Sequence, residues 1–582
     1  MKKRLCSLIA VVLSAALLLG VMPLSAFSQE SALNVTVASD IHYQSFVDTG
    51  ALEDVEHEDA LMKGLQNPDM YYYASQQGQM NFESRAITKQ MLAAFAASDD
   101  PYLFICGDLT CGGRQSHLEM AQLLKETEEE SGKQIYVILG NHDCASASSD
   151  TKISMEEFKT IYADFGYSEA VTVDDASACY TADLPENFRL MAIDSCIYGK
   201  DDGEVNEDEI TWIRAQIEAA EAEGKTLIAM MHHSLLPHYE VQPMIDDYEN
   251  LANILGDAGV TYVLTGHIHA NDISSAVTKG GRTVYDIQTG SLITYPCPYR
   301  HITFSQNAIN ISTEYVTSID ESDLPTGYTD EQLNAIKADF PAFAKGFFEA
   351  GMCRWLNRYI GSAVKLGKTL KMDTESLAYK TLNSLMLKIG DALALPIYDD
   401  GTTPGTADSF EEIAENAGYT LPKSDYTRVY QLVAAVMSGF FCGDEAPTVK
   451  TTEIPLAIAC VRACLAHCIA NMISGGKGTE GINALVKELT GASVTDRMVG
   501  SLANFNFADN AANLLVDAIL EPLLAGLSCD LSDPADLNLT LPGYGETEAP
   551  ANTLPLTWWQ KVLRFLKAFF GSLLSGILHT NP

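Results

Sequence analysis

Carboxylate, amide and imidazole side chains recur in this sequence where runs of apolar residues end. Five short motifs of this kind occur in order: ASDIH (Asp40, His42), GDLT (Asp108), GNHD (Asn141, His142, Asp143), MHHS (His232, His233) and GHIH (His267, His269). Half of the 12 histidines of the chain belong to these motifs. Imidazole nitrogens together with carboxylate and amide oxygens are ligands for divalent transition metals. The residue types therefore predict a metal centre.

The spacing within the motifs indicates how the ligands could be shared. Alternate residues of an extended chain point the same way, so Asp40 and His42 can reach one metal, and His267 and His269 can serve neighbouring metals. Two cations about 3.5 to 4 Å apart need a ligand that touches both, and a short carboxylate can bridge them. Asp108 is our candidate for the bridge. Each motif alone also fits a surface turn, but five in order behind apolar runs favour a shared site.

The elements that must position these residues are short strands that alternate with helices. Apolar runs predict strands at NVTVASD, YLFICGD, QIYVILGN, FRLMAIDS, TLIAMMH, TYVLTGH and TVYDIQTGS. Amphipathic stretches between them predict helices, several of them closed by a glycine. This alternation is typical of a layered α/β domain whose strands are covered on both faces. The carboxyl ends of such strands converge on one crevice, which is where the five motifs lie.

The ordered motifs resemble the calcineurin-like metallophosphoesterase superfamily over roughly residues 33–304. GDLTCGG and YVILGNHD are most similar to class III cyclic-nucleotide phosphodiesterases within it. The resemblance implies a four-layer α/β/β/α metallophosphatase sandwich with a two-metal centre. On the matching positions, one metal would be held by Asp40, His42, Asp108 and His269, and the other by Asp108, Asn141, His232 and His267.

The resemblance also implies roles for residues beside the ligands. His142 would be the general acid or a transition-state stabiliser, and Asp143 would orient its ring. Either histidine of MHHS could be the ligand; we choose His232, which directly follows the strand, and place His233 in a supporting position. GSLITYPCPYR adds Tyr299 or Arg300 as residues near the site.

Cys111 stands where purple acid phosphatases carry a tyrosine, so we expect no ferric-tyrosinate centre. The nitrogen and oxygen ligands suit two divalent ions chosen from Mn, Fe, Zn, Ni or Co.

The expected activity is hydrolysis of phosphate esters, with diesters preferred over monoesters. A hydroxide that bridges the two metals would attack phosphorus in line, and His142 would donate a proton to the departing alkoxide. The alternatives are a phosphomonoesterase or nucleotidase, and a surface-attached lipid- or glycan-binding protein whose metal centre is structural.

The first segment predicts export. Residues 1–28 have a basic start, an apolar stretch and small residues before a cleavage point after Ser28, as a secretory signal peptide has. An uncleaved membrane anchor is the alternative. We expect a secreted or cell-surface protein. Loss of the three basic residues in this segment would change the net charge from −40 to −43. So acidic a surface disfavours polynucleotide partners.

The remaining chain is too long for one domain. We expect a metallophosphoesterase domain at 33–318, with an insertion at 43–85 whose aromatic run Tyr71–Tyr73 either lines an entrance or packs the loop down. A mostly α-helical C-terminal domain at 320–529 and a Pro, Gly and acid-rich linker at 530–556 follow.

Residues 557–579 predict an amphipathic tail helix with a basic face. It resembles an interfacial membrane helix, and the alternative is a helix that folds back on the protein.

Three cysteines, Cys460, Cys464 and Cys468, recur every four residues along one predicted helix. Neighbours on one helix face rarely reach disulfide geometry. We therefore expect buried free thiols that pack as small apolar groups, with a metal cluster that includes His467 as the alternative.

Overall fold

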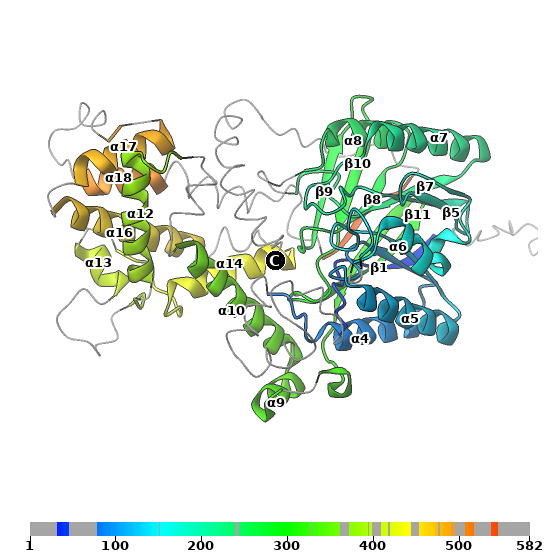
Figure 1. The fold of residues 1–582 in the computed structure, drawn as a ribbon, viewed down its shortest axis with the longest axis horizontal. Helices are drawn as coiled ribbons and strands as arrows, with labels where there is room; N and C mark the ends of the chain where they lie inside the picture. The colour runs from blue at the N-terminus through cyan, green and yellow to red at the C-terminus, as the bar shows by residue number, and fades with distance from the viewer. Residues whose placement is uncertain are drawn as a thin grey trace, which may run out of the picture.

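The structure is a computed structural model in which two β-sheets face each other (Figure 1). It describes residues 32–45, 78–149, 152–238, 242, 244–325, 328–360, 372–393, 395–398, 409–416, 420–443, 453–474, 478–491, 493–494, 507–516 and 537–544. The predicted signal peptide 1–28, the run Tyr71–Tyr73 and the predicted tail helix 557–579 lie outside these residues. Of the insertion 43–85, only the two ends are described.

The described strands form one six-stranded and one seven-stranded sheet. The first has the order β13 (Asn538–Pro542), β12 (Ala308–Tyr315), β11 (Pro298–Ser305), β1 (Ala32–Ala38), β2 (Tyr102–Cys106) and β3 (Gln134–Ile138). The second has the order β4 (Thr172–Val173), β5 (Tyr180–Asp183), β6 (Phe188–Ile193), β7 (Thr226–Met231), β8 (Tyr262–Thr265), β10 (Thr283–Gln288) and β9 (Asp272–Val277).

Helices cover the outer face of each sheet. In Figure 1, α4 (Ser84–Ala97) and α5 (Arg114–Ser131) lie on one side of the strands, and α7 (Glu207–Glu223) and α8 (Tyr248–Asp257) lie on the other. Short helical segments, α6 (Met155–Ile161), η1 (Ala163–Tyr167) and η2 (Glu321–Asp323), complete the connections. The four-layer α/β/β/α prediction is confirmed.

The two cores follow from the alternation of side chains along each strand. In β7, Ile228 and Met230 belong to the apolar cluster shared with the first sheet. Their neighbours Leu227, Ala229 and Met231 belong to the cluster between the second sheet and its helices. Both faces of the strand are buried, which is why its sequence is continuously apolar.

Parallel pairing brings the chemistry-bearing motifs to one edge. β1, β2 and β3 are mutually parallel, and so are β6, β7, β8 and β10. The carboxyl ends of the parallel strands in a sheet therefore lie at one edge of it, where polar side chains from several loops can meet.

The C-terminal region is helical, as predicted. Its described helices are α9 (Asp330–Ala338), α10 (Phe340–Ile360), α12 (Leu377–Leu393), α13 (Phe410–Asn416), α14 (Val429–Cys442), α16 (Glu453–Ser474), α17 (Gly478–Thr490) and α18 (Phe507–Leu515). The helices from α12 to α18 enclose a separate apolar cluster, whereas Ile336 of α9 and Phe340, Ala344 and Phe347 of α10 belong to the core of the sandwich. In α16, Pro455–Ile473 is long and apolar enough to cross a membrane by length and composition alone, and half of that stretch is buried within the protein.

The predicted thiol stripe lies in this second core. Cys460, Cys464 and Cys468 are buried in the apolar cluster of the helices, and none of the ten cysteines whose side chains the structure describes forms a disulfide. The prediction of buried thiols outside disulfides is confirmed for these three positions. His467 instead contacts the Asn471 amide, 2.9 Å from its Nε2.

The range predicted as a linker, 530–556, needs a correction. Residues 538–542 form β13, which pairs antiparallel with β12 and places Ala308 opposite Pro542. Leu541 is buried in the core of the sandwich, and Tyr544 packs against it. The strand is short and surrounded by Pro, Gly and acidic residues, so its sequence reads as a linker. The helical region is therefore an insertion between two adjacent strands of one sheet.

Candidate metal centre

The five motifs all emerge at carboxyl ends of strands. Asp40 and His42 follow β1, Asp108 follows β2, Asn141 follows β3, and the pairs that begin at His232 and His267 follow β7 and β8. Both sheets contribute, and the seven predicted ligands are all buried. The structure thus brings together residues from 40 to 269 in the chain.

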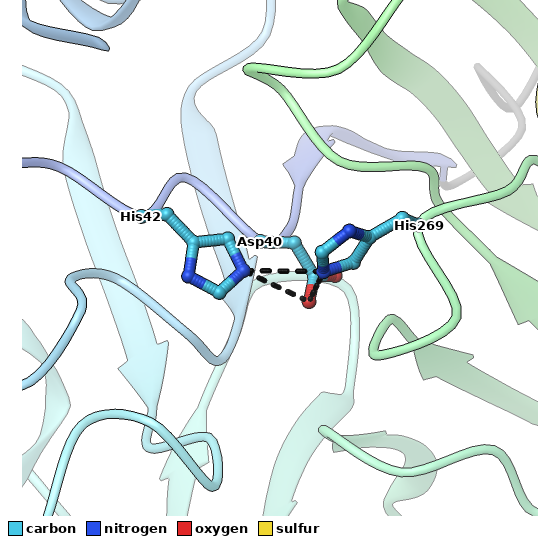
Figure 2. A group of neighbouring side chains, drawn as sticks. All are labelled: Asp40, His42 and His269. Carbon is cyan, nitrogen blue, oxygen red and sulfur yellow. Dashed lines mark hydrogen bonds and ion pairs between the residues drawn. The ribbon is translucent and has the colours of Figure 1, made fainter. Parts of the chain in front are cut away.

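A first group consists of Asp40, His42 and His269, whose ligand atoms point toward one another (Figure 2). Nε2 of His42 and Nε2 of His269 are 3.1 Å apart. The Asp40 oxygen Oδ1 lies 3.3 Å from the His269 nitrogen and 3.9 Å from the His42 nitrogen. Their buried side chains could hold one metal ion.

A second group lies beside the first and contains Asn141, His232 and His267. The Asn141 Oδ1 is 2.9 Å from Nε2 of His232 and 3.0 Å from Nδ1 of His267. The two imidazole nitrogens are 3.2 Å apart. This cluster offers one amide oxygen and two imidazole nitrogens to a second ion.

Asp108 lies between the two groups. Its Oδ2 is 3.6 Å from Nε2 of His42 and 3.3 Å from Nε2 of His232. Its Oδ1 accepts a hydrogen bond from the backbone N–H of His142 at 2.8 Å. One carboxylate thus reaches both clusters, which is the position that we predicted for the bridge.

The backbone at these residues is unusual. Asp40, His42, Asp108, His267 and His269 all have positive φ, between 43° and 71°. Non-glycine residues rarely adopt this left-handed region, and strain of this kind concentrates at functional sites. Gly140 lets the backbone after β3 approach the Asp108 carboxylate closely, because a Cβ at this position would overlap that carboxylate. The local backbone is therefore shaped for the cluster.

The charges of the site suit a cation. Burial would raise the pKa of Asp40, but the His269 and His232 imidazoles outweigh it and lower that pKa. Burial also opposes ionisation of Asp108, yet His232 and His142 hold its pKa well below the usual value. Burial lowers the pKa of His42 to about 3, so its nitrogens are free to coordinate. Two carboxylates thus face a neutral imidazole.

The residues fit a pair of divalent ions. Asp40 Oδ1 is buried and accepts no hydrogen bond within the described part of the chain, although it faces two imidazole nitrogens. A buried carboxylate oxygen without a partner is costly. In each cluster two imidazole nitrogens lie 3.1 or 3.2 Å apart, close enough for both to bind one cation. The donor set is that of a transition-metal site.

His142 and Asp143 are placed differently from each other. The His142 ring is half-buried, with its centroid 5.1 Å from that of His42, so it borders the site. The prediction that Asp143 orients this ring is wrong. The buried Asp143 carboxylate accepts hydrogen bonds from the backbone N–H groups of Leu109, Thr110 and Gly140 at 2.9 to 3.1 Å. Asp143 ties together the loops after β2 and β3.

His233 lies next to the second cluster. Its ring centroid is 4.2 Å from that of His267, and Nδ1 contacts Ser195 Oγ at 2.9 Å. The choice of His232 as the residue facing Asn141 and Asp108 agrees with this arrangement.

Tyr299 and Arg300 make their described contacts elsewhere. Tyr299 donates to the Glu314 carboxylate on β12 at 2.9 Å. Arg300 is fully buried and donates to the Gln288 carbonyl at 2.9 Å and to Thr313 Oγ1 at 3.2 Å. The contacts with Glu314 and Thr313 join β11 to β12, and the contact with Gln288 joins β11 to β10 of the other sheet. A direct role at the site therefore remains only a prediction for both residues.

Sequence reasoning missed two supporting residues. His117 on α5 contacts Thr110 Oγ1 and the Asp143 carbonyl, each at 2.9 Å, and thereby braces the loop after β2. Ser291 donates from its hydroxyl to the Asp40 carbonyl at 2.8 Å. His117 stands in no motif, and Ser291 stands in GSLITYPCPYR, from which only Tyr299 and Arg300 were chosen. Their only signal in the sequence was their position: His117 lies in the predicted helix after GDLT, and Ser291 ends the predicted strand segment TVYDIQTGS.

Comparisons with known proteins agree with this geometry. Residues 33–271 match the family model described as calcineurin-like phosphoesterase. The chain is 25% identical over 182 residues to a probable cyclic nucleotide phosphodiesterase of Rhodococcus erythropolis, covering 31% of this chain and 54% of that protein. It is 28% identical over 168 residues to a probable glycerophosphodiester phosphodiesterase of Arcobacter nitrofigilis, covering 28% of this chain and 54% of that protein. The chain spans about half the length of the curated relatives it matches.

Among solved structures, a dimetal phosphatase from Danio rerio aligns with a TM-score of 0.35 at 11% identity. The alignment covers 49% of this chain and 96% of that one. The fold assignment rests on the two sheets and their helices.

Proposed function

We propose that this protein hydrolyses phosphate esters at the two clusters joined by Asp108, because residues 33–271 match the family model described as calcineurin-like phosphoesterase. The observation that carries the proposal is the position of Asp108 Oδ2, within 3.6 Å of His42 and 3.3 Å of His232. Two divalent cations bound there would activate water and neutralise charge on the phosphate oxygens. Asp40, His42 and His269 would hold one cation, and Asn141, His232 and His267 the other.

His142 supplies the proton for the leaving group in this proposal. Its ring borders the first cluster and is half-buried, so a substrate oxygen can approach it. Its backbone N–H is held by Asp108, which fixes the ring's starting point relative to the clusters. Asp143 keeps the two loops together without touching the substrate.

Phosphodiesters are the preferred substrate class. The motifs GDLTCGG and YVILGNHD and the names of the two relatives, both phosphodiesterases, support this choice. Phosphomonoesters are the alternative, and a substrate panel decides between them.

The direct experiment compares hydrolysis of bis-p-nitrophenyl phosphate and p-nitrophenyl phosphate with and without Mn²⁺. We expect faster cleavage of the diester, dependence on the metal, and a loss of at least about 100-fold in Asp108→Asn. Asp100→Asn is the matched control, because Asp100 lies at the opposite, amino end of β2, where it contacts His301. Equal, metal-independent rates in parent and Asp108→Asn would leave a purely structural metal centre as the better explanation.

We further propose that the protein is exported and that residues 557–579 attach it to a membrane surface, on the strength of their sequence alone. N-terminal sequencing of the mature protein should begin at Gln29. Removal of residues 557–582 should abolish co-sedimentation with anionic liposomes and leave diester hydrolysis unchanged. Retained liposome binding would remove the membrane proposal.

A further inference from the structure

We propose that the helical insertion positions His269, because the middle of α10 and the end of α14 hold the segments on either side of this histidine. The inference rests on the metal centre proposed above and assigns a task to a region without chemical motifs. Phe441 and Gly443 at the end of α14, and Phe348 in α10, are the residues that carry it.

The end of α14 contacts the loop that follows His269. The backbone N–H of Asn271 donates to the carbonyl of Phe441 at 3.2 Å. Gly443 caps the helix in the left-handed conformation, with φ of 70°. A Cβ on Gly443 would collide with the Asn271 carbonyl oxygen, so the two backbones are in direct contact.

The segment 269–271 is held from its other side by the loop after β10. The Asn271 side-chain oxygen accepts from the Gly290 N–H at 3.0 Å. The Ser291 N–H donates to the His269 carbonyl at 3.2 Å. The loop that bears His269 is thus clamped between the α14 end and residues 290–291.

Phe348 of α10 supports a second neighbour of His269. Its ring contacts Phe441, with centroids 4.9 Å apart, and it closes on Gly78, where a Cβ would lie 2.5 Å from the Phe348 ring. Gln79, the next residue, places its Nε2 3.4 Å from His269 Nδ1. Phe348 and Phe441 are both buried. The Phe348–Phe441 pair therefore packs beside both segments that adjoin the histidine, the one that bears Gln79 and the one that bears Asn271.

His269 needs such support. Its φ of 62° is left-handed, a conformation that a non-glycine residue keeps only when its surroundings enforce it. The insertion is also fixed at both ends, since the chain enters it from β12 and returns to pair with β12 through β13. Metal ligands commonly depend on residues beyond the coordination shell for their orientation.

The experiment compares Gly443→Ala with Gly491→Ala. Both glycines end helices of the insertion with φ of 70°, so the added methyl strains the backbone equally. Only at Gly443 does the methyl meet Asn271; at Gly491 no atom of the described residues lies within 4 Å of it. Co²⁺ titration followed by visible absorption, with metal content after desalting, reports each bound cation.

We expect Gly443→Ala to bind one of two cations at least about tenfold more weakly, with a changed Co²⁺ spectrum. Gly491→Ala should match the parent. Hydrogen exchange of residues 267–271 should rise in Gly443→Ala alone. A folded Gly443→Ala protein with two parental affinities and the parental spectrum would overturn the proposal.

The variant His269→Ala separates this inference from the proposed function. It should lose the same cation, and adding Gly443→Ala to it should change metal binding no further, because both act through one ligand. If His269→Ala keeps both cations, the metal centre itself is wrong; if it loses one while Gly443→Ala loses none, only the positioning role is wrong.

A second pair of variants covers a failure to fold. Should Gly443→Ala not give a folded protein by circular dichroism, Phe348→Leu tests the same contact without adding an atom. Phe410→Leu is its control, since Phe410 is equally buried but lies in the separate core of the insertion. Weaker binding of one cation in Phe348→Leu alone supports the proposal, and equal binding in both contradicts it.

Discussion

Asp143 acts on its neighbours through their backbone. Burial and the nearby charge of Asp108 raise the pKa of this carboxyl to about 7, while three backbone N–H groups stabilise its ionised form. The N–H groups belong to the loops that carry Asp108 and Asn141. One carboxylate without access to substrate thus fixes the distance between two predicted ligands.

His238 is a second buried charge that the reaction does not use. Its Nε2 lies 3.2 Å from Asp286 Oδ2, and its Nδ1 lies 3.4 Å from Asp272 Oδ2. Burial lowers its pKa, but the two carboxylates outweigh burial and raise the pKa to about 10. His238 lies in the connection between β7 and α8 that begins at His232, so this ion pair fastens that connection to β9 and β10.

The ion pair of His238 predicts a pH dependence of stability. A histidine whose pKa is higher in the folded state stabilises the fold fully below its unfolded pKa, about 6.5, and loses this effect as the pH rises through about 10. His238→Gln should remove the part of the decline in unfolding free energy that the titration of this histidine causes at high pH. Urea unfolding of both proteins between pH 6 and 10.5 measures it. Parallel curves for parent and variant would contradict the ion pair.

At the residue level, the sequence predicted which ligands meet but not how their neighbours are used. The strand ends and the Asp-x-His and His-x-His spacings were enough to group Asp40, His42 and Asp108. The direction of the Asp143 side chain depends on the left-handed turn at Asp108, which the residue types do not reveal. The spacing of residues along the chain also does not indicate that Arg300 donates hydrogen bonds to Thr313 on β12 and to Gln288 on β10.

At the element level, the buried parallel strands were predictable and the half-exposed antiparallel ones were not. β7 is continuously apolar, whereas β12 alternates buried Ile309 and Ile311 with exposed polar residues. Apolar runs predicted seven strands, and β4, β5, β9, β11, β12 and β13 were not among them. Antiparallel strands at the side of a sheet commonly show this alternation.

β13 gives a prediction at this scale. Leu541 is 8% exposed within the core of the sandwich, so Leu541→Ala should lower the free energy of unfolding by about 2 to 4 kcal/mol. Thr540→Ala, on the exposed face of the same strand, should change it by less than about 1 kcal/mol. Chemical denaturation compares the two. A Leu541→Ala protein as stable as the parent would detach β13 from the sandwich.

For the whole molecule, the net charge favours cations at the site, and the topology brings the helical insertion next to one of the predicted ligands. A protein of net charge −40 repels an anionic phosphate ester, and cations in a buried site reverse the local sign. The helical insertion leaves the sandwich after β12 and returns at β13. Its α14 contacts the loop of His269, and its α10 packs against Gly78, next to Gln79. Sequence alone predicted the helices but not this return, because β13 carries only two apolar side chains besides its proline.

The most direct test is an anomalous diffraction measurement on crystals grown with Mn²⁺. Two peaks are expected about 3.5 to 4 Å apart, one beside Asp40, His42 and His269 and one beside Asn141, His232 and His267, with Asp108 touching both. A single peak, or peaks away from Asp108, would contradict the two-cation account.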